Sequence, residues 1–205
     1  MVDKLIVTNR AALRTKYGAR GLVKVTAAVK ALIAADRKRG LVTRLIALDS
    51  AAMKRYGSAV TDASSARQNK RAIDSLYRAL RPHYLMILGS IDVIPHQDPK
   101  NPVYADDQED DPVAWGDLPY ACDVPYSRDI TKFIGPTRVI GRLPDMTGAS
   151  EPSHLLACLQ TAVTYKQRPL APYLDYFALS VPLWKQSSAL SLAHIFGNAR
   201  ELLLA

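Results

Sequence analysis

The stretch YLMILGSIDVIPH, Tyr84–His96, gives the clearest indication of the fold of this chain. Its first five residues are apolar and lie between Pro82 and Gly89, a pattern typical of a strand that is buried on both faces of a parallel sheet. Gly89 allows the chain to turn sharply where this strand ends. Because sites in open α/β sheets are usually built beyond the carboxyl ends of the strands, we expect the loop with Asp92 and His96 to lie at such an edge.

Strand and helix patterns alternate before and after this stretch. Strands are predicted near residues 4–8, 43–48, 84–88, 137–143 and 176–181. Helices are predicted over residues 22–39, from a cap at Asp62 or Ser64 to about Leu80, from about residue 150 through Val163, and over residues 188–204, with residues 9–21 as a connection. This alternation predicts a three-layer α/β/α sandwich with a mainly parallel sheet and right-handed crossovers, with the first two helices on opposite or alternate faces.

Residues 95–136 interrupt this alternation. They hold seven prolines and an acidic run, and they show no helical period. A connection of this length without structure of its own is uncommon in a compact domain. We therefore interpret it as a functional or interface loop that could contain a small hairpin, inserted in one α/β domain that spans residues 1–205.

Composition favours a soluble protein of the cytoplasm. The chain has 205 residues, of which 48% are hydrophobic, an ordinary fraction for a domain that buries a core. Cys122 and Cys158 form neither a disulfide framework nor a metal-ligand spacing, so we expect both to be reduced and structural. The segment MVDKLIVTNR lacks the long apolar segment of a signal peptide, and no apolar run approaches the ~18 residues of a membrane span, so no membrane partner is expected.

Charge is distributed unevenly along the chain, whose net charge is +8. Residues 1–85 contain 18 Lys and Arg against 5 Asp and Glu, whereas residues 86–125 contain 1 against 9. A basic face could bind nucleic acid. No basic run is interleaved with aromatic residues, so we favour solvated helix faces that an acidic loop partly balances, and nucleic acid is not the expected partner.

Short catalytic motifs give little information. The sequence contains no GxxxxGK[ST] or GxGxxG phosphate loop and no GxSxG elbow. Its four histidines are scattered, and for His83, His154 and His194 we favour structural or surface roles. His96 is the better functional candidate, because it follows the central strand.

The order of several segments is more specific than any single motif. YLMILGSIDVIPHQDP is followed by an acidic loop, then GDLPYACDVPY, TRVIGRLPD and a helix that ends in TYKQRP. Over roughly residues 84–200 this order resembles the gingipain/clostripain-type branch of the caspase-fold cysteine peptidases, and the first 80 residues agree with it in element order only. The residues that match the family pattern are Tyr84–Leu88, Gly89, Ile94, Pro95, Asp117, Tyr120, Val139, Gly141, Arg142 and Tyr165.

This resemblance implies a caspase-like fold and a Cys–His dyad that hydrolyses peptide bonds. A thiolate attacks the carbonyl, an imidazole transfers the proton, and backbone N–H groups bind the oxyanion. In the family the His lies just after the next strand, typically in a His-Gly pair, and the Cys follows the strand beyond that. Cys122 and Cys158 occupy other segments, so we assign no catalytic residue within this chain.

We therefore expect the chain to be the N-terminal, large part of a caspase-fold cysteine peptidase, inactive alone. The segment Glu201–Ala205 ends on an apolar run and has no cap or polar tail, which adds to the expectation that the domain continues. The expected partners are a protein or peptide substrate and the C-terminal remainder of the same domain. The alternative is a non-catalytic caspase-like module that binds a protein partner.

The segment Val181–Leu192 departs from the family pattern. The resemblance implies a carboxylate there that selects a basic P1 side chain, and the segment contains none. Trp184, Ser187 and Ser188 could instead line the wall of a substrate-binding pocket. A strand-to-helix turn with Ser188 as its N-cap is the alternative.

The acidic run at residues 106–111 is a candidate calcium site. Its carboxylates are Asp106, Asp107, Glu109, Asp110 and Asp111, and Ca²⁺ prefers such oxygen ligands. The run lacks the spacing and the glycine of an EF-hand, so we favour a solvated loop or an internal partner for the basic half over a calcium site. At the carboxyl ends of the strands it would form an acidic lid that favours a cationic substrate segment or a calcium ion.

Overall fold

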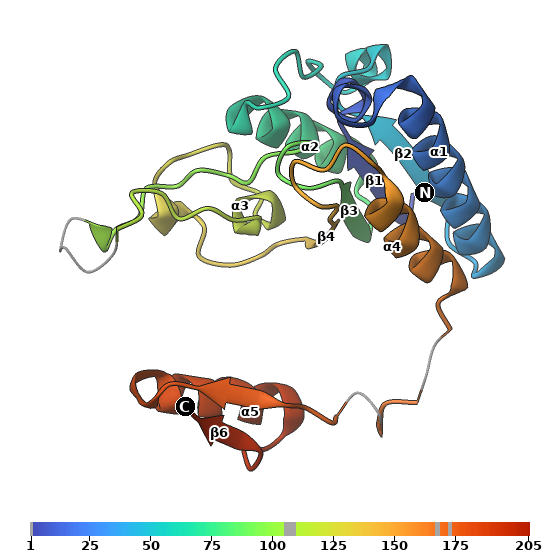
Figure 1. The fold of residues 1–205 in the computed structure, drawn as a ribbon. Helices are drawn as coiled ribbons and strands as arrows, with labels where there is room; N and C mark the ends of the chain where they lie inside the picture. Colours follow the sequence, from blue (N-terminus) through green and yellow to red (C-terminus); the bar gives the residue numbers. More distant parts are fainter. Residues whose placement is uncertain (1, 105–109, 167–168, 172–173) are drawn as a thin grey trace. The chain divides into compact units, whose positions relative to one another are not determined.

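A four-stranded sheet forms the centre of the first of two compact units, Met1–Thr164 and Tyr165–Ala205 (Figure 1). The computed structural model describes residues 2–104, 110–166, 169–171 and 174–205. The strands are β1 (Lys4–Thr8), β2 (Thr43–Ala47), β3 (Tyr84–Leu88) and β4 (Val139–Leu143), in the spatial order β2-β1-β3-β4. All three strand pairs are parallel. The predicted mixed α/β class with a mainly parallel sheet is therefore confirmed, and a single caspase-like domain over residues 1–205 stays a prediction.

The boundaries of the strands follow local hydrogen bonding. β1 and β3 have the predicted limits, and β2 ends one residue early. β4 begins at Val139 rather than at Thr137. The N–H groups of Thr137 and Arg138 donate to the carbonyl of Ala121, at 2.9 and 3.2 Å, and so the ladder with β3 starts only after them.

Three long helices connect or follow the strands. They are α1 (Arg10–Lys38), α2 (Ala66–Leu80) and α4 (Ser153–Thr164), with a short 3₁₀ segment η1 (Ala51–Arg55) between β2 and α2. The strand order reverses between β1 and β3, so right-handed crossovers place α1 and α2 on opposite faces of the sheet. Figure 1 shows α1 beside α4 on one side of the sheet and α2 on the other. This arrangement is compatible with the predicted three-layer sandwich.

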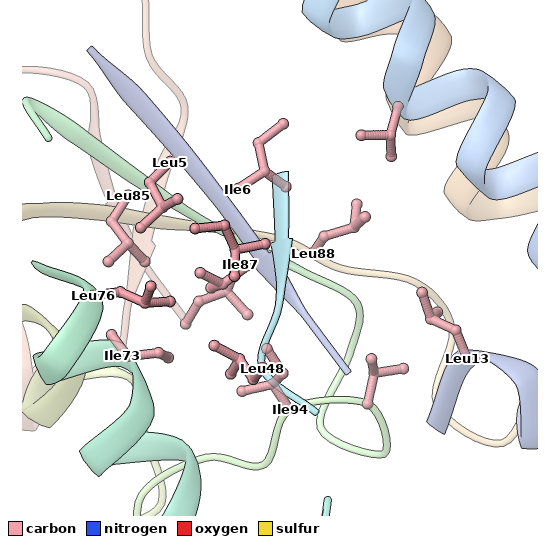
Figure 2. Close-up of a cluster of buried hydrophobic side chains, with 14 of the residues drawn as sticks. Leu5, Ile6, Leu13, Leu48, Ile73, Leu76, Leu85, Ile87, Leu88 and Ile94 are labelled. Atoms are coloured by element: carbon pink, nitrogen blue, oxygen red, sulfur yellow. The ribbon is translucent and has the colours of Figure 1, made fainter. Parts of the chain in front are cut away.

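Apolar side chains on both faces of the sheet form the core. Figure 2 shows Leu5 and Leu85 on the side of Ile73 and Leu76 of α2, whereas Leu13 of α1 lies on the opposite side. All five side chains are at most 2% exposed. Full burial of such a side chain stabilises the fold by roughly 1.5–3 kcal/mol, so these contacts attach both helices to the sheet.

The start of α1 corrects the predicted connection at residues 9–21, most of which is helical. The carboxylate of Asp49, after β2, accepts hydrogen bonds from the backbone N–H groups of Arg10 and Ala11, at 3.0 and 2.6 Å. A cap supplied from a distant strand is not visible in local sequence. Gly18, with φ 66° and ψ −179°, then bends the helix and continues it in a new direction.

The cap of α2 is also corrected. The hydroxyl of Ser65, and not Asp62 or Ser64, accepts the N–H of Gln68, at 3.3 Å. The carboxylate of Asp62 instead accepts the N–H and the hydroxyl of Ser64, at 2.9 and 2.6 Å, in the preceding turn. The helix is capped at its C-terminus by Arg81, which adopts a left-handed φ of 43°, and the next residue is Pro82.

The proline-rich loop has some structure in its described part. Antiparallel bridges pair Gln97 with Gly116 and Lys100 with Val113, as in a small hairpin. The one-turn helix α3 (Leu118–Ala121) and the 3₁₀ segment η3 (Ile130–Lys132) follow.

The second unit contains two parallel strands, β5 (Ala178–Ser180) and β6 (Leu202–Leu204). Between them lie the 3₁₀ segment η5 (Pro182–Trp184) and α5 (Lys185–Phe196). The predicted helix over residues 188–204 is wrong at both ends, because Gly197 adopts φ 78° and ends α5, and the next apolar residues form a strand. Five apolar residues that would form one face of such a helix are not buried: Leu192, Ile195, Phe196, Ala199 and Leu203.

Candidate functional site

The carboxyl ends of β1, β3 and β4 meet where the strand order reverses, which is the usual position of a site in an open α/β sheet. The first turns of α1, before the bend at Gly18, pass over this edge. Two groups of polar side chains lie here. We call them the Lys16 cluster (Lys16, Tyr17, Ser90, Asp92 and Asp145) and the Arg142 cluster (Arg142, Asp117 and the carbonyls of Gly89 and Ile94).

The ammonium group at the centre of the Lys16 cluster lies between two carboxylates. Lys16 Nζ is 2.7 Å from Asp92 Oδ2 and 3.0 Å from Asp145 Oδ2, and it also donates to the carbonyl of Met146 at 2.8 Å. The side chains of Lys16 and Asp145 are 7% and 0% exposed. Partial desolvation makes such a charge pair stronger and its geometry more fixed than that of a surface pair.

Asp145 connects the loops after β3 and β4. Its Oδ1 accepts the N–H of Ser90 at 2.6 Å, and its Oδ2 accepts the hydroxyl of Tyr17. Burial raises the pKa of the Tyr17 phenol, and the hydrogen bond to the neighbouring carboxylate raises it further. Tyr17 is therefore a neutral donor at physiological pH, which makes it a positioning residue rather than a base.

Asp92 is the more accessible carboxylate of the cluster. Its burial acts to raise its pKa, but hydrogen bonds from Lys16 and from the N–H of Gly148 outweigh this effect and lower the pKa. Asp92 is thus ionised and ties the loop after β3 to both α1 and the loop after β4. The predicted position of Asp92 at the carboxyl edge is confirmed.

The Arg142 cluster holds the proline-rich loop against the same edge. Arg142 Nη1 donates to the carbonyls of Gly89 and Ile94, each at 2.9 Å. Its Nε and Nη2 donate to the two carboxylate oxygens of Asp117, at 2.8 and 2.6 Å. This arrangement satisfies the planar guanidinium on both edges, and a lysine could not reproduce it.

Two further contacts fix the turn after β3. Gly89 has φ 111°, and a Cβ there would lie 2.7 Å from the Cβ of Val93, so this position requires glycine. The hydroxyl of the fully buried Tyr120 donates to the carbonyl of Pro95 at 2.9 Å. The turn is therefore specified by its backbone as well as by the Arg142 cluster.

A buried ion cluster lies between α2 and the loop before β4. Lys70 Nζ is 2.6 Å from both carboxylate oxygens of Asp74, and Arg138 Nη2 is 3.0 Å from Asp74 Oδ1. The side chains of Lys70 and Arg138 are 0% exposed. Burial lowers the pKa of Lys70, and the adjacent carboxylate opposes that shift. Sequence analysis missed this cluster: Lys70 and Asp74 have the i,i+4 spacing of a helical ion pair, but Arg138 is far from them in the chain, and nothing local shows that the pair is buried.

The cysteines and histidines form no arrangement that supports peptide hydrolysis within the described residues. Cys122 is buried, and its thiol donates to the carbonyl of Gly135 at 3.2 Å. Cys158 Sγ lies 3.6 Å from Nε2 of His154, one turn earlier in α4. The N–H groups in the middle of a helix donate to the helix's own carbonyls and cannot bind an oxyanion. The Cys158–His154 pair therefore lacks the oxyanion-binding N–H groups that peptide hydrolysis requires. A functional role for the half-buried His96 stays a prediction.

The predicted substrate-binding residues lie at the end of η5, for Trp184, and in the first turn of α5, for Ser187 and Ser188. The side chain of Trp184 is exposed, and the hydroxyl of Ser187 donates to its carbonyl at 3.0 Å. Ser188 is not the N-cap, because α5 begins at Lys185; its hydroxyl lies 2.9 Å from that of Ser180. A role of Trp184, Ser187 and Ser188 in binding substrate stays a prediction.

The predicted calcium site falls mostly outside the described residues. Asp106, Asp107 and Glu109 lie there, and Asp110 and Asp111 are exposed. Within the part of the chain that the structure describes, no three His, Cys, Asp or Glu side chains are grouped as metal ligands. A calcium ion or an acidic lid at this run stays a prediction.

Comparisons with protein-family models, with curated proteins and with solved structures find no match for this chain. Among its described helices, none combines the length and the apolar character needed to cross a bilayer. The site must therefore be interpreted from its own geometry.

Proposed function

We propose that this chain forms the N-terminal part of a caspase-fold cysteine peptidase. In the complete protein, the catalytic His and Cys lie C-terminal to residue 205 and are brought to the carboxyl edge of the sheet.

One observation carries this proposal: the Arg142 cluster joins the segments that resemble the gingipain/clostripain-type peptidases. Gly89, Ile94, Asp117 and Arg142 are related in the sequence only by their order, and they share hydrogen bonds in the structure. Tyr120 and Pro95, two further residues of the same pattern, are bonded to each other. Because the members of this sequence pattern contact one another, the pattern is better explained by a shared structural role than by chance.

In this proposal the two clusters give a rigid floor to the substrate cleft. Arg142 and Asp145 hold the loops after β3 and β4 in place, so a peptide laid across the edge meets a preorganised surface. The dyad acts above this floor: the thiolate attacks the peptide carbonyl, the imidazolium protonates the leaving amine, and water hydrolyses the thioester.

Substrate choice in this proposal does not depend on an acidic pocket from the turn after β5. Residues 181–192 contain no carboxylate, so this segment gives no preference for a basic P1 side chain. Trp184, Ser187 and Ser188 offer an apolar ring and hydroxyls instead.

The protein expressed from the complete gene should hydrolyse members of a fluorogenic peptide library. Iodoacetamide should abolish this activity, and Cys158→Ser should retain it. If no peptide is cleaved and the protein still captures a protein partner, the non-catalytic caspase-like module is the correct alternative.

A further inference from the structure

A basic groove lies between α2 and the loop before β4, and none of its lining residues belongs to the two clusters at the carboxyl edge. Its volume is about 220 Å³. Residues of α2 at helical spacing form one wall and two residues of the loop before β4 form the other: Arg67, Arg71, Asp74, Ser75, Arg78, Pro125 and Tyr126. We call it the α2 groove.

The arginines of the α2 groove have more charge than the surrounding carboxylates neutralise. The guanidinium of Arg67 lies over the ring of Tyr126, 5.1 Å from its centre. Arg71 forms no ion pair with any described carboxylate. Arg78 is 58% exposed and is 3.6 Å from Asp123, a distance at which an exposed pair contributes little.

The one acidic residue on the floor of the groove is already neutralised. Asp74 pairs with Lys70 at 2.6 Å and with Arg138 at 3.0 Å, and both cations are fully buried. Asp123 Oδ1 is 3.4 Å from Arg138 Nη2, so Lys70 and Arg138 are balanced by Asp74 and Asp123, and the excess positive charge comes from the three arginines on the walls of the groove. The local field therefore favours an anion.

We propose that the α2 groove binds a phosphate monoester dianion. Arg67 and Arg71 are one turn apart on the same helix face, so two guanidinium forks can contact one group with three terminal oxygens. A carboxylate has fewer oxygens and one charge and would use only one fork fully. Pockets for drug-sized ligands occupy roughly 300–1,000 Å³, so the α2 groove fits a single phosphorylated group.

The test is to titrate the protein with phosphate compounds and to measure binding by calorimetry and by amide chemical-shift changes in NMR spectra. Inorganic phosphate, a sugar phosphate and a phosphoserine peptide distinguish the sources of the group, and the same peptide with Asp in place of phosphoserine tests the need for phosphate. We expect binding that weakens with salt, and amide shifts at residues 67–78 and at Tyr126. Arg71→Gln and Arg67→Gln should each weaken binding by about 10-fold, the loss expected for a charged hydrogen bond.

Two controls complete the experiment. Arg20→Gln removes an exposed arginine of α1 outside the groove and should leave the affinity unchanged. Arg71→Lys keeps the charge but not the fork and should give an intermediate affinity. The proposal is overturned if none of the phosphate compounds binds at millimolar concentration, if the Asp peptide binds as tightly as the phosphopeptide, or if Arg20→Gln weakens binding as much as Arg71→Gln.

Discussion

Arg142 and Asp117 form a two-point ion pair, in which Nε lies 2.8 Å from Oδ2 and Nη2 lies 2.6 Å from Oδ1. Arg142 belongs to β4, and Asp117 immediately precedes α3 in the proline-rich loop. The remaining edge of the guanidinium binds the turn after β3. This one side chain therefore sets the distance between three segments of the candidate site.

Arg142→Met should destabilise the protein by about 3 kcal/mol, because it leaves Asp117 and two carbonyls without their donor. Chemical denaturation measures this change. The matched control is Arg128→Met, whose pair with Asp98 at 3.4 Å involves a half-exposed arginine and should cost less than about 1 kcal/mol. Equal losses in the two variants would contradict the central role of the Arg142 cluster.

Gly89→Ala should cost at least about 2 kcal/mol, because the residue would keep a strained φ and its Cβ would overlap Val93. Gly116→Ala is the control, since its Cβ would meet nothing within 4 Å and its φ is not positive. Thermal and urea denaturation of both variants measure the difference. A Gly89→Ala protein as stable as the Gly116→Ala protein would show that the turn relaxes freely.

Asp74→Asn should destabilise the protein by about 3–5 kcal/mol, because it leaves Lys70 buried without a counter-charge and leaves Arg138 with only the half-exposed Asp123, at 3.4 Å. Lys70→Met should cost at least about 1 kcal/mol less, because Asp74 keeps Arg138 as its partner. Urea denaturation at neutral pH orders the two variants. The reverse order would contradict the assignment of Asp74 as the shared anion of this cluster.

Asp92 should contribute to stability in a pH-dependent way. Its pKa is lower in the folded protein than in the unfolded chain, so its contribution is present above about pH 4, near the unfolded pKa, and is lost as the pH falls through the folded pKa. Asp92→Asn should therefore be less stable than the native protein at neutral pH, and the gap should close in acid. Asp110→Asn, at an exposed position of the loop, should show no such gap at either pH.

Much of the sheet was predictable because its strands are encoded locally. The apolar run at β3 and its glycine gave the strand limits and the turn, and the edge rule placed Asp92 correctly. Asp145 could have been found by the same rule, since it follows β4 by two residues. Its partner Lys16 could not, because the first turns of α1 depend on Asp49, a cap contributed by another strand.

In the second unit, prediction from local sequence was less accurate. The helical spacing of apolar residues predicted that α5 extends to residue 204. It failed there because a short run of leucines is compatible with a strand as well as with a helix. Gly197 was the available signal: a left-handed residue there ends the helix, and Leu202–Leu204 then pairs with β5. In the buried ion cluster, the i,i+4 spacing of Lys70 and Asp74 was a local signal for an ion pair, but Arg138 meets Asp74 only in the folded chain, so neither the third member nor the burial of the cluster was predictable.

The central claim is tested most directly by the position of the reactive cysteine. The protein from the complete gene is treated with a peptidyl acyloxymethyl ketone, and the alkylated residue is identified by mass spectrometry. We predict one modified cysteine C-terminal to Ala205, with Cys122 and Cys158 unmodified. Modification at Cys122 or Cys158, or no modified cysteine in a folded protein, would contradict the proposal of a caspase-fold peptidase.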